Sequence, residues 1–110
     1  MPDFRQALSV NDLPPGGGAP VTLDGLTIAL FNAGGRFYAV DNACPHRGAA
    51  LVDGALNDTR ITCPLHRWTF DLAIGENPAM PDVAMRRYPV EVRDGVAFID
   101  IELQSARNVF

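Results

Sequence analysis

Two short stretches, CPHRG at residues 44–48 and CPLHRW at residues 63–68, contain every cysteine and histidine of the chain. The chain has two cysteines and two histidines, spaced C-x-H and then C-x2-H, with sixteen residues between His46 and Cys63. A thiolate and an imidazole so close in sequence can reach the same metal centre from one tight loop. The pattern therefore predicts a centre held by Cys44, His46, Cys63 and His66.

Two kinds of metal centre use this ligand set. Structural zinc sites usually group like ligands, with a pair of cysteines followed by a pair of histidines. Here each stretch carries one of each, which favours a binuclear iron-sulfur cluster with both thiolates on one iron and both imidazoles on the other. A structural zinc module and a metal-free copy of the motif are the alternatives.

The longer pattern around these stretches resembles a known family. CPHRG followed by C-P-L-H-x-W-x-F-D-L-x-x-G-E, which ends at Glu76, is similar to the cluster-binding signature of the Rieske [2Fe-2S] ferredoxins, and the likeness continues over most of the chain. The resemblance implies one [2Fe-2S] cluster per chain. It also implies that Cys44 and Cys63 bind one iron and that His46 and His66 bind the other.

Length, charge and hydropathy restrict the class of protein. The chain has 110 residues, of which 47% are hydrophobic and 20% charged, so we expect a single domain over residues 1–110. A net charge of −4 argues against nucleic acid and anionic membranes as partners. We see neither a secretory signal nor an apolar run of membrane-spanning length, and we expect a cytoplasmic protein whose cysteines are ligands rather than a disulfide.

Alternating apolar residues and turn signals predict many short strands. Asp-Gly or Gly-Gly pairs at residues 24–25, 34–35 and 94–95 predict hairpin turns. Residues 11–18 are expected to form turn and loop without helix, residues 75–78 a turn, and residues 78–82 an irregular segment, because two prolines interrupt it. Strands are expected at residues 4–10, 21–23, 26–32, 37–40, 60–62, 68–71, 87–93 and 96–101.

This spacing of strands predicts an all-β protein, an antiparallel sandwich or barrel. The family resemblance narrows the expectation to the Rieske fold, in which a small cluster-binding subdomain is inserted between the strands of stacked antiparallel sheets. We place this subdomain at about residues 43–71. Each pair of predicted ligands then follows a strand.

Several neighbours of the ligands are candidates for supporting roles. Gly48 would let the backbone approach the cluster closely, although it is equally well explained as an ordinary turn glycine. Trp68 offers an indole N–H as a hydrogen-bond donor near the cluster. Pro78 resembles part of the proline-rich loop that covers the cluster in the family, or simply breaks a strand. Arg47 and Arg67 flank the histidines and are candidates for partner docking, although solvated arginines are common at loop tips.

The same resemblance predicts a low reduction potential. High-potential Rieske proteins of cytochrome bc complexes place a serine and a tyrosine after the second histidine, where this chain has Trp68 and Phe70. They also carry an extra disulfide, at places that correspond to Ala49 and Leu65. Fewer hydrogen bonds to the cluster sulfurs stabilise the reduced state less, so we expect a potential near the bottom of the Rieske range.

The predicted function is one-electron transfer rather than catalysis by this chain alone. The sequence has no G-x-G-x-x-G dinucleotide motif, and both histidines are already used, so none is left for mononuclear iron. We expect a ferredoxin that passes electrons from a flavoprotein reductase to a terminal oxygenase and that is a monomer when free. The alternative within the family is the small subunit of NADH-dependent assimilatory nitrite reductase, partnered by the large subunit.

Overall fold

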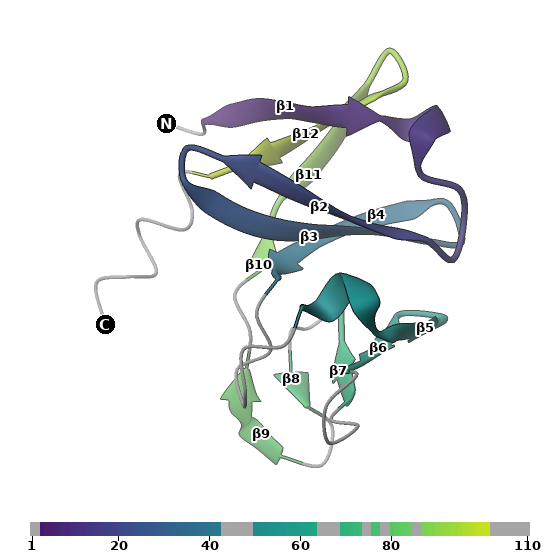
Figure 1. The fold of residues 1–110 in the computed structure, drawn as a ribbon, viewed down its shortest axis with the longest axis vertical. Coiled ribbons are helices and arrows are strands. Elements are labelled where there is room, and N and C mark those ends of the chain that lie inside the picture. The colour runs from purple at the N-terminus through teal and green to yellow at the C-terminus, as the bar shows by residue number, and fades with distance from the viewer. Residues whose placement is uncertain are drawn as a thin grey trace.

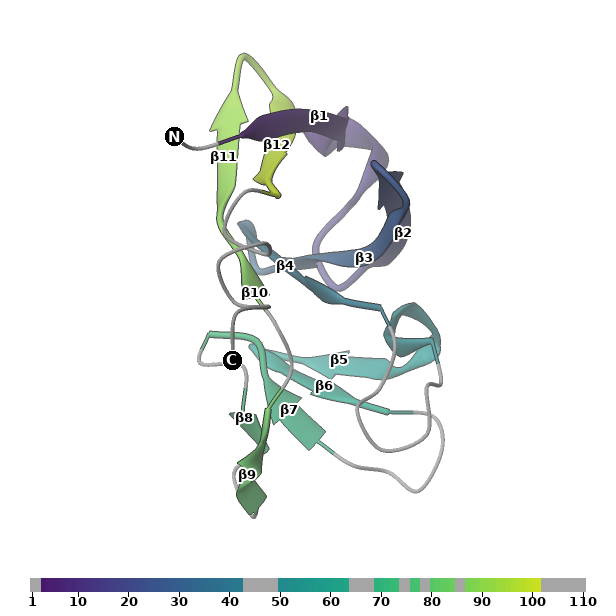
Figure 2. The same cartoon turned by 90° about the vertical axis from the view of Figure 1, so that its left-hand side faces the viewer.

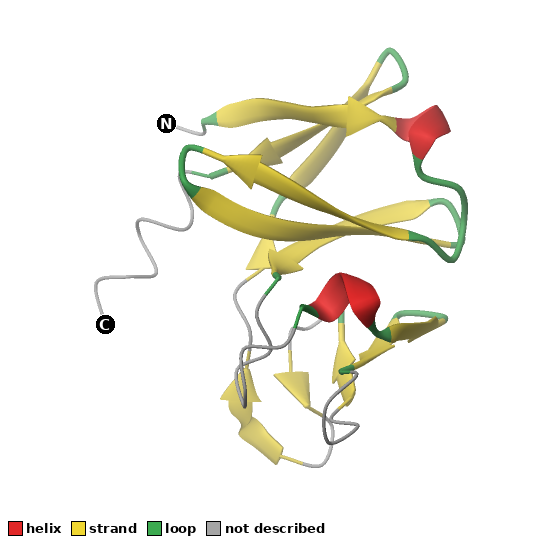
Figure 3. Cartoon of the chain, in the orientation of Figure 1, coloured by secondary structure: helices red, strands yellow, loops and turns green. Residues whose placement is uncertain are grey.

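The computed structural model describes residues 3–42, 50–63, 69–73, 76–77, 80–84 and 87–101. Within these ranges the chain forms strands and two single-turn 3₁₀ helices, η1 (Val10–Asp12) and η2 (Leu51–Asp53) (Figures 1 and 3). The strands are β1 (Phe4–Ser9), β2 (Gly18–Leu23), β3 (Leu26–Ala33), β4 (Arg36–Asp41), β5 (Ala55–Asn57), β6 (Arg60–Thr62), β7 (Thr69–Asp71), β8 (Glu76–Asn77), β9 (Met80–Ala84), β10 (Arg87–Tyr88), β11 (Val90–Arg93) and β12 (Val96–Asp100). The predicted all-β class is confirmed.

Two antiparallel sheets surround one apolar interior. One has the strand order β1-β12-β11 and the other β10-β4-β3-β2, and Figure 2 shows them curving around a common space. Strand residues alternate between the two faces of a sheet, so every second side chain points into this interior and is buried there. We call this set the barrel core: Leu13, Val21, Ile28, Leu30, Ala39, Tyr88, Ala97, Ile99 and Ile101.

The predicted hairpin turns are confirmed. At Asp24-Gly25 both residues have positive φ, 51° and 82°, and Leu23 pairs with Leu26 across the turn. Asp94-Gly95, with φ of 51° and 76°, joins β11 to β12 in the same way. A type I′ turn needs positive φ at both central residues, which aspartate and glycine adopt more readily than most. The Gly34-Gly35 turn likewise joins β3 to β4.

A third sheet, with the order β5-β6-β7-β8-β9, lies below the barrel in Figures 1 and 2. Between it and strands β3 and β4 is a second apolar cluster, the junction core: Ala29, Phe31, Val40, Leu51, Ile61, Cys63, Phe70 and Leu72. Strand β4 contributes to both cores, since Ala39 belongs to the barrel core and Val40 to the junction core. The cluster-binding subdomain placed at residues 43–71 stays a prediction; the third sheet itself continues to Ala84.

Two predictions from local sequence were wrong in detail. Residues 11–18 were expected to contain no helix, but η1 includes Asn11 and Asp12, and the Ser9 hydroxyl accepts a hydrogen bond from the Asn11 amide at 3.4 Å. Strand β2 also begins at Gly18 rather than at residue 21. Serine favours the position before a helical turn, which explains why a turn forms here despite the following prolines.

The proline-containing segment after β7 was also predicted wrongly. Glu76 and Asn77 form β8 instead of a turn, and Pro81 lies inside β9, which pairs with β8 through Ala84 and Met80. Strand β9 is at the edge of its sheet, where a residue without an N–H can be accommodated, and the pairing is irregular between the two paired positions. The short strand β5 was not predicted at all.

Gly54 offers a test of how tightly β5 is joined to β6. A Cβ at Gly54 would lie 2.1 Å from the Thr62 carbonyl oxygen, a backbone atom that cannot move aside alone. We expect Gly54→Ala to lower the free energy of unfolding by about 3 kcal/mol. The control is Gly25→Ala, where a Cβ meets nothing within 4 Å and only the positive φ costs about 1 kcal/mol. Equal losses in urea unfolding would contradict the tight packing.

Candidate metal centre

The first predicted ligand loop is closed at its base by Asn42. This residue follows β4, and its carbonyl oxygen accepts a hydrogen bond from the Leu51 amide at 2.7 Å. Its side-chain Oδ1 accepts another from the Val52 amide at 3.2 Å. The two ends of the segment are thereby held together. The segment itself, with Cys44, His46, Arg47 and Gly48, lies outside the described residues.

The second predicted ligand loop connects β6 and β7. These strands pair as an antiparallel hairpin, with Thr62 opposite Thr69 where the loop begins and ends. The two threonine hydroxyls share a hydrogen bond of 3.1 Å, which closes the base of the loop. Cys63 is described. His66, Arg67 and Trp68 lie outside the described residues, as does Pro78.

The bases of the two loops are neighbours. Strand β5, which follows the first loop through η2, pairs with β6, and Ala55 lies opposite Thr62. The backbone of Gly54 packs closely against the Thr62 carbonyl. Leu51, after the first loop, and Cys63, at the start of the second, both belong to the junction core. The fold therefore brings the bases of the two loops to the same region of the molecule.

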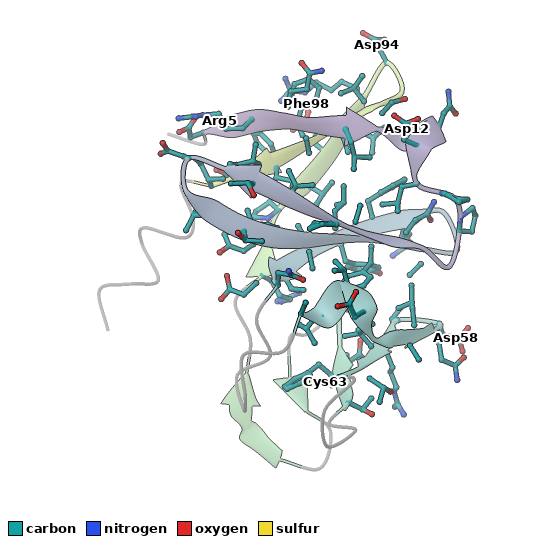
Figure 4. The ribbon with its side chains drawn as sticks, in the orientation of Figure 1. Arg5, Asp12, Asp58, Cys63, Asp94 and Phe98 are labelled. Carbon is teal, nitrogen blue, oxygen red and sulfur yellow. The ribbon has the colours of Figure 1, made fainter. Side chains whose placement is uncertain are left out.

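Cys63 is buried, with 1% of its surface exposed, and is labelled in Figure 4. A thiolate placed in such an apolar setting is costly unless a cation compensates its charge, and iron does so while lowering the thiol pKa. The burial of Cys63 at the base of its loop thus fits a ligand of the thiolate-bound iron in an iron-sulfur cluster. Among the predicted ligands, Cys63 is the one that the described ranges include.

Phe70 lies in the strand that leaves the second loop. It is fully buried, pairs with Ile61 across the β6–β7 hairpin, and packs in the junction core. A phenylalanine ring offers no hydroxyl to a cluster sulfur. Phe70 is therefore a packing residue of the junction core, a role that was not predicted from the sequence.

The pKa shifts resolved in the described residues belong to two exposed pairs on the three-stranded sheet. Arg5 donates a hydrogen bond to Asp3, 2.9 Å from Nε to Oδ1, and this bond lowers the pKa of the Asp3 carboxyl. Arg93 lowers the pKa of Glu91 through a bond of 2.8 Å. The Arg93 guanidinium also lies over the rings of Phe4 and Phe98, at 5.4 and 5.0 Å. These pairs are parts of the barrel, not of the ligand loops.

Residue types alone did not identify the side chains that hold the loops. Asn42, Thr62 and Thr69 were not singled out from sequence, although each lies within two residues of a predicted loop. A polar residue directly before or after a ligand motif is the one local signal that could have pointed to them. In the described ranges, no helix is long and apolar enough to cross a bilayer.

Comparisons with known proteins place the chain in a family. The model of the Rieske [2Fe-2S] domain matches residues 4–90. The 3-phenylpropionate/cinnamic acid dioxygenase ferredoxin subunit of Escherichia coli K12 is 38% identical over 97 residues, which are 86% of this chain and 91% of that protein.

Two solved structures are similar over most of their length. A chain from the complex of reduced oxygenase and oxidised ferredoxin in carbazole 1,9a-dioxygenase aligns with a TM-score of 0.79 at 28% identity, over 88% of this chain and 92% of that one. A protein assigned as the NADH-dependent nitrite reductase small subunit of Mycobacterium tuberculosis aligns with a TM-score of 0.83 at 29% identity, over 90% and 95%. The chain thus belongs to the Rieske [2Fe-2S] domain family, whose cofactor is a [2Fe-2S] cluster.

Proposed function

We propose that this chain is a Rieske-type ferredoxin that takes one electron at a time from a flavoprotein reductase and passes it to a terminal oxygenase. The observation that carries the proposal is the match along nearly the whole of a dioxygenase ferredoxin subunit. A further support is the structural likeness to a chain from an oxygenase–ferredoxin complex. The immediate partners would be redox proteins, and the chemistry on the substrate would occur in the oxygenase.

Four side chains would hold the cofactor: Cys44, His46, Cys63 and His66. The two thiolates cancel the +2 charge of two ferric ions and two sulfides, and the two neutral imidazoles add none, so the oxidised site is neutral. When bound, the cluster supplies reversible uptake of one electron, which a neutral site accepts more easily than one with four thiolates. Cys63 would contribute the buried side of this ligand set.

The described residues around the loops would keep the ligands in place during electron transfer. Asn42 closes the first loop, and the Thr62–Thr69 hydrogen bond closes the second. Ligands held by locked neighbours change their geometry little when the charge of the site changes. A carrier of this kind would exchange electrons with little rearrangement of its own backbone.

We further propose that the free protein is a monomer and acts in the cytoplasm. A reducing cytosol keeps cysteine thiols available as metal ligands. The second candidate function is the small subunit of an NADH-dependent nitrite reductase, which the likeness to the Mycobacterium tuberculosis protein favours. Both functions use the same cluster and differ in the partner that receives the electron.

The ligand role of Cys63 can be tested by Cys63→Ser. We expect this variant to lose the brown colour, the iron and acid-labile sulfide, and the Rieske-type EPR signal of the reduced protein, because a hydroxyl is a poor substitute for the thiolate. Ala55→Ser is the matched control, since it adds a serine at an exposed position opposite Thr62. A Cys63→Ser protein with a full cluster would exclude Cys63 as a ligand, and bound zinc without sulfide in the wild type would favour the zinc module.

The partner can be tested by reconstitution. We expect the holoprotein to support NADH-dependent product formation with the purified reductase and terminal oxygenase of the 3-phenylpropionate dioxygenase system, in proportion to its concentration. Cys63→Ser protein is the negative control. Turnover only with a nitrite reductase large subunit, measured as nitrite consumption, would favour the second function.

The reduction potential is a separate test of the surroundings of the cluster. Because Trp68 and Phe70 replace hydroxyl donors, we expect a midpoint near the bottom of the Rieske range of about −150 to +300 mV. Protein-film voltammetry measures it directly. A midpoint above about +100 mV would contradict the prediction.

A further inference from the structure

Strand β10 is only two residues long, yet each residue reaches a different part of the ligand-loop framework. Arg87 and Tyr88 pair with Val40 and Ala39 of β4. In Figures 1 and 2, β10 lies between the barrel and the five-stranded sheet. Its position is thus suited to connecting the two.

Tyr88 holds the base of the first loop. Its side chain is 3% exposed and belongs to the barrel core, and its hydroxyl donates to Asp41 Oδ1 at 2.5 Å. That length is typical of a hydrogen bond from a hydroxyl to a carboxylate, which is stronger than a bond between neutral groups. Asp41 is the last residue of β4 and directly precedes Asn42, which closes the first loop.

Arg87 holds the segment that follows the second loop. Its guanidinium donates to the carbonyl oxygen of Ala73. Ala73 is itself fixed, because its amide donates to Asp71 Oδ1 at 2.9 Å and the preceding Leu72 amide donates to the Thr59 carbonyl at 2.7 Å. Asp71 ends β7, the strand that leaves the second loop.

We propose that β10 is a brace that fixes the spacing between the bases of the two ligand loops, with Arg87 and Tyr88 as positioning residues for the cluster. This inference rests on the proposed function, since it requires one cluster held by both loops. Neither residue needs to touch the cluster. If either contact of the brace is lost, the β5–β6 pairing still keeps the loop bases near each other but their spacing varies more, so the ligands on one loop dissociate more readily.

The test compares the full-length holoprotein with Tyr88→Phe, Arg87→Gln and the double variant. Tyr38→Phe and Arg36→Gln are matched controls on β4; for neither side chain does the structure show a hydrogen bond within the described residues. The rate of cluster loss to an iron chelator is followed by visible absorbance, and the EPR linewidth of the reduced protein reports the spread of cluster geometries. Thermal unfolding by far-UV circular dichroism verifies the fold.

We expect each single variant to lose its cluster about tenfold faster and to show broader EPR lines, while the controls behave as wild type. The double variant should release its cluster no faster than the faster single variant, because a brace cut at one end no longer acts. Arg87→Lys, which keeps a donor for the Ala73 carbonyl, should restore most of the retention. If Arg87→Gln does not fold, Tyr88→Phe carries the test, because it removes the other contact of the brace. The brace would be overturned if the single variants released their cluster at the wild-type rate. It would also be overturned if the two single-variant increases in release rate multiplied in the double variant. A wild-type protein without a cluster would overturn the proposed function as well.

Discussion

Two loops that bind one cluster must begin at neighbouring points of the fold, and here the pairing of β5 with β6 provides this. The chain leaves the first loop, makes one helical turn and enters β5, which runs beside the strand that leads into the second loop. Neighbouring strands are about 4.8 Å apart, so this pairing limits the separation of the loop bases. Gly54 permits the closest approach, because any side chain there would overlap the Thr62 carbonyl.

With Cys63 as a proposed ligand, the junction core would link metal binding to folding. Cys63 packs with residues of the barrel, including Phe31 and Val40, and with residues of the third sheet, including Phe70. If Cys63 is a ligand, as we propose, packing positions it before it meets the metal, so the same contacts that stabilise the fold would prepare the site. Conversely, a bound cofactor stabilises the arrangement of strands that holds it. The two parts of the molecule therefore support each other through one shared apolar layer.

Local chemistry made much of the framework predictable. The Asp-Gly turns and the strand Arg60–Thr62 were identified correctly because φ preferences and residue alternation act within a few positions. The segment containing Pro81 was misassigned because its pairing depends on being at the edge of a sheet, which local sequence does not reveal. Tyr88 and Asp41 are 47 positions apart and meet through tertiary structure, which local sequence does not reveal. The proposed ligands stand out in the sequence for a different reason, since cysteine and histidine are scarce here and occur together.

Prolines occupy two outer strands, Pro20 in β2 and Pro81 in β9, each the last strand in the order of its sheet. An outer strand presents backbone groups that can recruit a strand from another molecule, and proline removes one of the donors needed for that pairing. A mobile carrier must meet different proteins in turn and separate from each. Edge strands that contain proline pair poorly with the edge strands of other copies of the chain, even at high concentration. They therefore favour transient complexes with redox partners over permanent assemblies.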